Sequence, residues 1–276
     1  MIDLGTGPAL PTLGRITLAV DEMDLLLDRL DLDELPVVLA QVPRFDSSAE
    51  RDAAFGVAAE SLAQRGLLDG DVVHDVLADR LRLLNRPHWA IALRLFRDET
   101  ISRLCIAGNG DLSVLALRGP DSYVLEDVTS DVGSVVVAAL GDAEPLVFAG
   151  FSAPTVELGA IFDDADADTA TTTQRIAEIA VPARESNIIA AAMADCRAHT
   201  EIVAVYYGDG TRNQAQAHVA VFDTRAGRFV ATSSVAADGT TWSALSSGSG
   251  PRIRHAVDEL VASLPERAEF APTFSP

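Results

Sequence analysis

The first part of the chain shows the apolar periodicity of amphipathic helices. Residues 14–19 favour a short strand, and a helix is predicted to begin near Asp21, with acidic residues in its first turn. Its apolar side chains recur at i, i+3, i+4 and i+7, as Met23, Leu26, Leu27 and Leu30. Residues 47–85 predict two further helices, the first capped by Ser47 or Ser48.

The period then changes to two, which is typical of half-buried strands. The segments that alternate in this way are residues 89–97, 101–107, 112–118 and 122–128. They are joined by the short polar stretches RDET, GNGD and GPDS. Turns of this length and composition join antiparallel neighbours, so we expect an antiparallel meander. A short helix is predicted after it, at residues 131–142.

The second half repeats this order of elements. The segments are a helix at residues 184–199, strands at 200–210, 213–224 and 227–236, and a closing helix at 250–265. We therefore predict an α+β fold in which two antiparallel β-meanders, flanked by helices, are related by a pseudo-twofold axis. The chain is expected to form one domain over residues 1–276. Its parts would be halves at about 14–141 and 184–265, a connecting segment at 142–183 and a flexible tail at 266–276.

Charge and composition exclude several classes of function. The chain has no lysine, and its 21 arginines face 41 acidic residues, for a net charge of -20. Such a surface repels phosphates, so we expect neither nucleic acid nor an anionic membrane as a partner. The absence of lysine also excludes Schiff-base catalysis and the phosphate-loop lysine. No apolar run reaches the length of a membrane-spanning helix, and the N-terminus does not resemble a signal peptide.

The sequence contains no metal-binding or nucleophile motif. The five histidines and two cysteines lack metal-ligand spacing, so the cysteines are expected to be core thiols in a reducing cytosol. The acidic run at residues 163–168 fails as a calcium loop, because Thr169 and Arg175 occupy the positions that need glycine and glutamate. A mobile loop or the start of a helix is expected there. We predict no cofactor and no metal.

Two alternative functions remain open at this stage. A hydrolase or transferase would use Asp223, Ser233 or Asp238, but it needs a base beside a nucleophile, and the sequence indicates none. A ligand-binding or regulatory module would instead need an enclosed apolar pocket with converging polar groups. Tyr206 and Tyr207 are adjacent on one predicted strand, so one is expected to face the core and the other to face outward, where it could contact a partner.

The succession of segments resembles the EspG family of chaperones associated with type VII (ESX) secretion. The resemblance covers nearly the whole chain. It is carried by "LAVDEMDLLLDRLDLDELPVVL", "RGLLDGDVVHDVLADRLRLLNRP", "LRLFRDETISRLCIAGNGDLSVLALRGPDSYVLEDV" and, most specifically, "TEIVAVYYGDGTRNQAQAHVAVFDTRAGRFVATSSVAADGTTWSALSSGSGPRIRHAVDELVASLP". The resemblance implies a pseudo-twofold α+β fold and a cytosolic, non-enzymatic protein. It also implies binding to the exposed apolar tip of the PPE subunit in a PE–PPE heterodimer, and a homodimer is left open.

The resemblance also implies which residues contact the partner. Family members use the loop between the first two meander strands, the strand that opens the second meander, and nearby helical elements. Carried over, these positions are Arg97, Asp98, Glu99 and Thr100 in the loop, and Glu201, Ile202, Val203, Ala204, Val205, Tyr206 and Tyr207 on the strand. The RDET loop is shorter than the loop with which some family members hold their partner. The chain therefore lacks that arm, and its partner can differ from theirs.

Overall fold

The structure of the chain is a computed structural model, and it describes residues 13–39, 44–110, 112–164, 167–208 and 211–265. The predicted tail at 266–276 and the last two residues of the predicted strand at 200–210 lie outside these ranges. None of the helices in the described part of the chain combines the length and the apolar character that crossing a bilayer requires.

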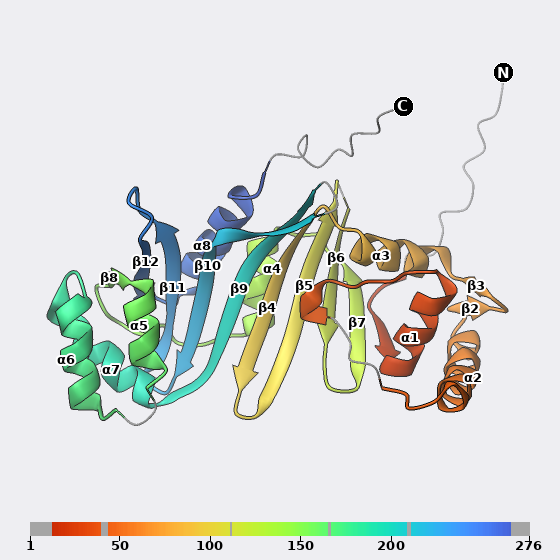
Figure 1. Cartoon of the computed structure of the whole chain (residues 1–276), viewed down its shortest axis with the longest axis horizontal. Helices are drawn as coiled ribbons and strands as arrows, with labels where there is room; N and C mark the ends of the chain where they lie inside the picture. The colour runs from red at the N-terminus through yellow and green to blue at the C-terminus, as the bar shows by residue number, and fades with distance from the viewer. Residues whose placement is uncertain (1–12, 40–43, 111, 165–166, 209–210, 266–276) are drawn as a thin grey trace, which may run out of the picture.

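Within the described residues, ten strands form one sheet (Figure 1). In the first half the strands are β1 (Ile16–Ala19), β4 (Trp89–Arg97), β5 (Thr100–Asn109), β6 (Leu112–Arg118) and β7 (Ser122–Asp127). In the second half they are β8 (Phe151–Pro154), β9 (Cys196–Gly208), β10 (Thr211–Thr224), β11 (Gly227–Val235) and β12 (Thr241–Ser247). A separate small hairpin pairs β2 (Leu68–Asp69) with β3 (Val72–Val73).

The strand order shows the pseudo-twofold relation between the halves. It runs β1-β7-β6-β5-β4-β9-β10-β11-β12-β8. In each half a short first strand pairs with the last strand of the meander, β1 with β7 and β8 with β12. The two meanders join where β4 and β9 pair antiparallel, from Trp89 opposite Tyr206 to Arg97 opposite Ala198. This confirms the predicted α+β fold with two antiparallel meanders.

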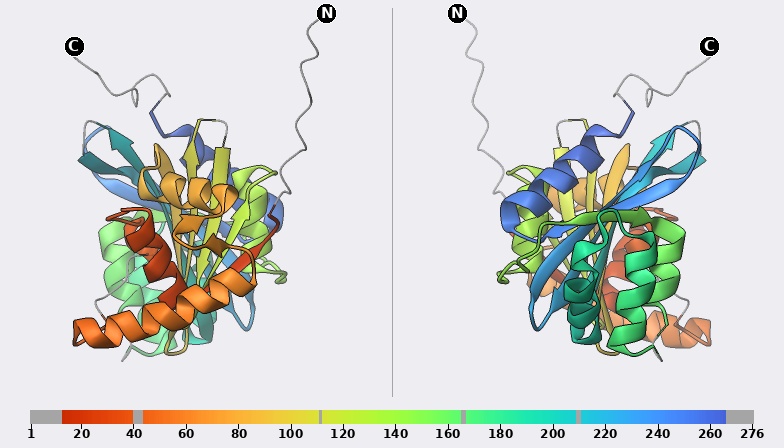
Figure 2. Two further views of the ribbon diagram at one scale, coloured as in Figure 1. Left: turned by 90° about the vertical axis from the view of Figure 1, so that its right-hand side faces the viewer. Right: turned by 90° about the vertical axis from the view of Figure 1, so that its left-hand side faces the viewer.

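Helices cover the two faces of the sheet differently, as the side views show (Figure 2). On one face, α1 (Val20–Arg29), the 3-10 turn η1 (Val37–Leu39), α2 (Ser48–Gln64) and α3 (Asp75–Asn85) lie over the first-half end of the sheet. On the same face, α5 (Thr155–Phe162), α6 (Thr169–Ile179), η2 (Ala183–Glu185) and α7 (Ser186–Ala194) lie at the second-half end. On the opposite face, α4 (Val132–Leu140) and α8 (Gly250–Ala262) cover the middle.

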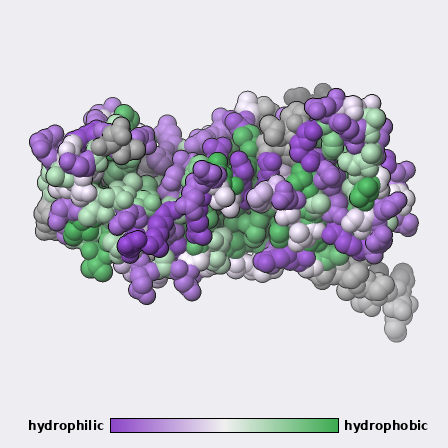
Figure 3. Space-filling model, turned by 90° about the horizontal axis from the view of Figure 1, so that it is seen from below, coloured by the Kyte–Doolittle hydropathy of each residue, from purple (hydrophilic) through white to green (hydrophobic). Residues whose placement is uncertain are grey.

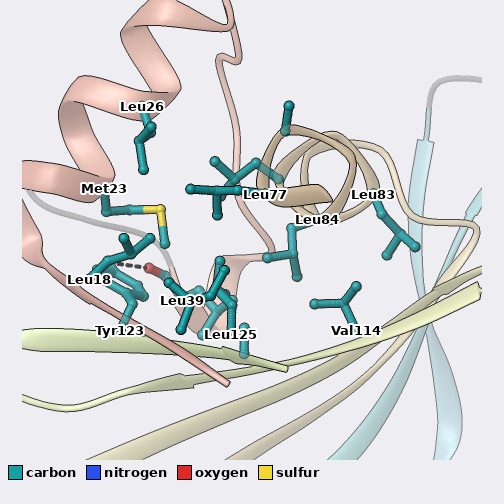
Figure 4. Packing of buried hydrophobic residues seen from close by; sticks show 14 of the residues in the cluster. Leu18, Met23, Leu26, Leu39, Leu77, Leu83, Leu84, Val114, Tyr123 and Leu125 are labelled. Carbon is teal, nitrogen blue, oxygen red and sulfur yellow. Dashed lines mark hydrogen bonds between the residues drawn. The ribbon is translucent and has the colours of Figure 1, made fainter. Parts of the chain in front are cut away.

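Each group of helices buries its apolar stripe in a separate core cluster. At the first-half end, Leu18, Met23 and Leu84 are fully buried around Tyr123 (Figure 4), whose hydroxyl donates to the Leu39 carbonyl at 3.2 Å. Burying one such apolar side chain stabilises the fold by about 1.5–3 kcal/mol. A second cluster joins α4 and α8 to the middle strands, and a third joins α5–α7 to β11, β12 and β8.

Local signals in the sequence fix several helix boundaries. Ser47 caps α2 by accepting from the Glu50 N–H at 3.2 Å, as one of the two predicted alternatives. The acidic run at residues 163–168 precedes α6, where Asp168 accepts from the Thr171 N–H at 2.7 Å. Asp164 in turn forms an ion pair with Arg175 at 2.6 Å. These acids therefore have structural partners at the start of a helix.

Some predicted elements differ from the structure. The predicted helix at 184–199 was wrong over its last residues, because α7 ends at Ala194 and Cys196 begins β9. Strand β12 was not predicted, since its sequence TWSALSS has few large apolar residues. The segment 142–183, expected to be connecting chain, contains β8, α5 and α6. In each case the element is stabilised by pairing or packing with distant residues, and local propensity alone does not reveal this.

Candidate functional site

The helices on one face leave the middle of the sheet uncovered between them (Figure 1). A pocket of about 350 Å³ lies over these strands, against η1. We call this pocket the central trough, and the sheet face that carries it the trough face. Its lining residues are Pro36, Val37, Val38, Ala90, Ala92, Arg94, Glu201, Val203, Val205, Tyr207, Arg212 and Gln214. Figure 3, seen from below, shows a mostly hydrophilic surface with apolar groups, one of them near the middle.

Strand alternation divides the predicted β9 segment between the two faces of the sheet. Glu201, Val203 and Val205 line the central trough. Ile202 and Ala204 are fully buried on the other face, in the cluster with α4 and α8. Successive side chains of a strand point to opposite faces, so a continuous run of residues cannot all contact one partner. The trough-facing positions are the ones available for binding.

The two adjacent tyrosines follow the same alternation. Tyr207 lines the central trough and packs against the first-half core. Tyr206 lies opposite Trp89 in the register and points to the other face. Both are half-buried, which differs from the expected pair of one core and one outward tyrosine. Burial raises the pKa of Tyr207 to about 12, so its hydroxyl stays neutral and can donate a hydrogen bond at any physiological pH.

The predicted loop is a tight hairpin at the lower end of β4 and β5 (Figure 1). Arg97 and Thr100 pair across it, and the Thr100 hydroxyl donates to the Arg97 carbonyl at 2.8 Å. Asp98 and Glu99 form its tip, with Asp98 in the left-handed region at a φ of 51°. All four side chains are exposed. None of them lines the central trough, although the hairpin belongs to the same strands.

A row of aromatic side chains crosses the trough face between the central trough and this hairpin. Phe96 stacks on His199 with ring centroids 4.5 Å apart, and His199 is 6.3 Å from Phe222. Phe222 in turn stacks on Phe229 at 4.7 Å. Offset stacking of this kind adds about 0.5–1.5 kcal/mol per pair beyond area burial. The row joins the middle strands to the second-half core and bounds the central trough on the side of the hairpin.

The structure places a histidine beside Ser233, which the sequence did not indicate. Ser233 Oγ lies 2.8 Å from His218 Nδ1 and accepts from the His218 backbone N–H at 2.7 Å. The register between β9 and β10 shifts between Gln214 and His218, and the β10–β11 ladder begins at Val219 opposite Thr232. The Ser233 side chain thus closes this ladder at its irregular end.

The other two candidates for hydrolytic chemistry, Asp223 and Asp238, have partners other than Ser233 and His218. Asp223 forms an ion pair with Arg228 at 2.5 Å. Asp238 accepts from the Thr240 N–H at 2.9 Å in the turn between β11 and β12. Ser233 is only 8% exposed, and burial lowers the pKa of His218. The geometry therefore favours a structural role for Ser233, because a nucleophile needs an accessible hydroxyl and an oriented base.

Replacing Ser233 by alanine tests that role. We expect the S233A variant to lose about 1 kcal/mol of unfolding free energy, because the His218 N–H loses its acceptor. Urea unfolding measures this loss, and hydrolysis of a p-nitrophenyl ester measures any nucleophilic activity. The ester rate is expected to equal that of the wild type, and a wild-type rate that vanishes in S233A would instead support the hydrolase alternative.

The described residues do not favour a metal site or a reactive thiol. Among them, no group of three or more His, Cys, Asp or Glu side chains could hold a metal ion. Burial raises the pKa of Cys105 to about 12, so this thiol stays protonated and unreactive. Burial also raises the pKa of Cys196. The lining of the central trough offers apolar contact, hydrogen bonding and charged groups at Arg94, Glu201 and Arg212.

Sequence reasoning did not identify the part of the central trough that comes from β4 and η1. Ala90, Ala92 and Arg94 line it from β4, and Val37 lines it from η1 with 54% of its side chain exposed. The alternation of residues 89–97 assigns the β4 side chains to one face. It does not indicate that this face remains uncovered, since that depends on where the helices pack.

Comparisons with known proteins agree with the fold. The sequence profile of the EspG family matches residues 19–259. ESX-1 secretion-associated protein EspG1 of Mycobacterium tuberculosis is 26% identical over 261 residues, spanning 92% of this chain and 88% of that protein. ESX-3 secretion-associated protein EspG3 of Mycolicibacterium smegmatis is 26% identical over 263 residues, spanning 92% and 89%.

A solved structure shares the same architecture. The Mycobacterium tuberculosis type VII secretion system chaperone EspG5, in complex with a PE25–PPE41 dimer, has a TM-score of 0.74 to this structure. The match covers 91% of this chain and 97% of that chain at 18% sequence identity. At that identity the likeness shows a common fold.

Proposed function

Because the chain belongs to the EspG family, we propose that it is a cytosolic, non-enzymatic chaperone of type VII secretion. Its cargo would be a PE–PPE heterodimer, bound through the exposed tip of the PPE helical bundle. Binding would keep that apolar tip from aggregating before export. The chemistry of the surface is consistent with binding, since the candidate nucleophile Ser233 serves the β-ladder.

The observation that carries this proposal is the central trough. Its floor is apolar at Ala92, Val203 and Val205, and it stays uncovered between the helices that cover both ends of the same face. A fixed sheet floor between two helical ends gives a concave surface that needs little rearrangement to receive a helical tip. An interface of standard size buries about 1,600 Å² in total.

We propose the trough-facing members of the predicted set as contacts. These are Glu201, Val203, Val205 and Tyr207. The hairpin residues Arg97, Asp98, Glu99 and Thr100 would contact the partner at the lower edge. With only two residues at its tip, this hairpin contributes a short rim, so most of the contact area would come from the trough.

Co-expression with the PE–PPE pairs encoded in the same genome tests the proposal. We expect one pair to co-elute with the chain in size-exclusion chromatography, at the mass of a 1:1:1 complex. The same pair with its PPE tip truncated is expected to elute separately. Failure of every pair to co-elute would reject the chaperone function, and a homodimer would appear in the same experiment as a larger species without cargo.

A further inference from the structure

Charged side chains from four neighbouring strands form a row across the trough face. Arg118 on β6 lies directly opposite Arg103 on β5, Arg103 opposite Arg94 on β4, and Arg94 opposite Glu201 on β9. Directly opposite residues of an antiparallel pair share a face, with Cβ atoms about 4.5–5.5 Å apart. We call these four residues the arginine row, and Arg94 and Glu201 line the central trough.

Repulsion among the three arginines of the arginine row destabilises the folded state. Like charges directly opposite one another in a sheet are destabilising, and here three arginines are consecutive. Arg118 is held by its own chain, donating to the Leu39 carbonyl at 3.2 Å and lying over the Tyr123 ring. Within the described ranges, the hydrogen bond of the Arg103 side chain goes to the Ile101 carbonyl, at 3.4 Å.

Arg94 and Arg103 form no ion pair with any carboxylate among the described residues. The arginines that form ion pairs with carboxylates in the described residues are all others. Glu201 is directly opposite Arg94, yet these two described residues form neither an ion pair nor a hydrogen bond with each other. The chain has 41 acidic residues, yet it places none of its described carboxylates against these two guanidinium groups.

We propose that the arginine row recognises a carboxylate on the partner, beside the apolar anchor that enters the central trough. This inference rests on the proposed function. It specifies in addition that the cargo tip carries an acidic side chain beside its apolar anchor. Arg94 and Arg103 would share an acidic side chain, because adjacent guanidinium groups can donate to one carboxylate. Complementary charge of this kind sets orientation and selects among partners.

The order of charges makes the recognition directional. Proceeding from β5 to β9, the row reads Arg103, Arg94, Glu201. A tip with its acid over β5 and β4 satisfies both arginines. A tip placed the other way would bring that acid against Glu201. The adjacent glutamate and the net charge of -20 also disfavour a polyanion such as nucleic acid as the occupant.

Neutralising the arginines tests the inference on the complex found by co-expression. The double variant R94Q/R103Q is expected to bind the PE–PPE pair at least about 10-fold more weakly at about 50 mM NaCl. For the wild type, affinity is expected to fall as salt is raised to about 300 mM, whereas the variant changes much less. Biolayer interferometry gives both values, and R225Q, at an exposed arginine in the β10–β11 turn, is the matched control.

Thermal unfolding supplies an independent readout. Removing two opposed positive charges is expected to leave the melting temperature equal or higher, so weaker binding by R94Q/R103Q cannot come from unfolding. If the wild type binds a PE–PPE pair and R94Q/R103Q binds it equally at both salt concentrations, the arginine row does not recognise the cargo, while the chaperone function stands. If the wild type binds no pair, both proposals fail.

Discussion

A glutamate in place of Val203 is expected to weaken cargo binding by at least about 100-fold, equivalent to about 2.7 kcal/mol. Val203 lies in the middle of the central trough, between Ala92 on β4 and His218 on β10 in the register. An apolar anchor seated there would have to desolvate the new carboxylate without a partner, and central buried positions are where binding energy concentrates. Co-elution and biolayer interferometry with the PE–PPE pair measure the effect.

The matched control is the same substitution at Val57. This residue lies on α2, away from the central trough, with 71% of its side chain exposed. V57E introduces the same charge into an already acidic protein and is expected to leave binding unchanged. Both variants should keep the circular dichroism spectrum of the wild type, because Val203 is only half-buried. Binding of V203E within about threefold of the wild type would remove the central trough from the interface.

Replacing Arg228 by alanine is expected to lower the unfolding free energy by about 3–5 kcal/mol. Arg228 is 5% exposed and forms a bidentate pair with Asp223, at 2.5 and 3.0 Å. It also donates to the Gly141 and Leu140 carbonyls at 2.7 and 3.0 Å, at the end of α4. Without it, a largely buried carboxylate and the carbonyls of a helix C-terminus would lose their partner.

The position of Arg228 explains why the effect should be global. The side chain ties α4, from the first half, to the β10–β11 hairpin of the second half. Urea unfolding of R228A measures the loss. The R225A control removes an exposed arginine from the same hairpin and should change the free energy by no more than about 0.5 kcal/mol. R228K keeps the charge but not the bidentate fork, so an intermediate loss is expected. A loss below about 1 kcal/mol in R228A would contradict this role.

The predictions that held depend on neighbouring residues. Alternation over residues 89–128 specifies four strands, and short turns between them make the meander antiparallel. Ser47 caps α2 through its own third neighbour, Glu50. These signals act over a few residues, so the sequence carries them without knowledge of the fold.

The predictions that failed needed partners far away in the chain. The alanine-rich stretch before Cys196 favours a helix by propensity, but Ala198 is fixed in β9 by pairing with Arg97. Strand β12 has weak β-propensity and is held between β11 and β8, with Trp242 opposite Ser234 and Pro154. Tertiary pairing overrides propensity in both segments.

By itself, the sequence determined the α+β class, the two meanders, the acidic character and the resemblance to the EspG family. Only the tertiary structure decided which residues line the central trough, our candidate site. The antiparallel pairing of β4 with β9 places Ala92 beside Val203, and helix packing leaves these strands uncovered. The same pairing aligns Arg94 with Glu201, whereas the β4–β5 hairpin aligns Arg94 with Arg103. The β9 side chains alternate between the trough face and the core with α4 and α8. Alternation tells which residues share a face, but which face stays open depends on contacts between residues distant in sequence.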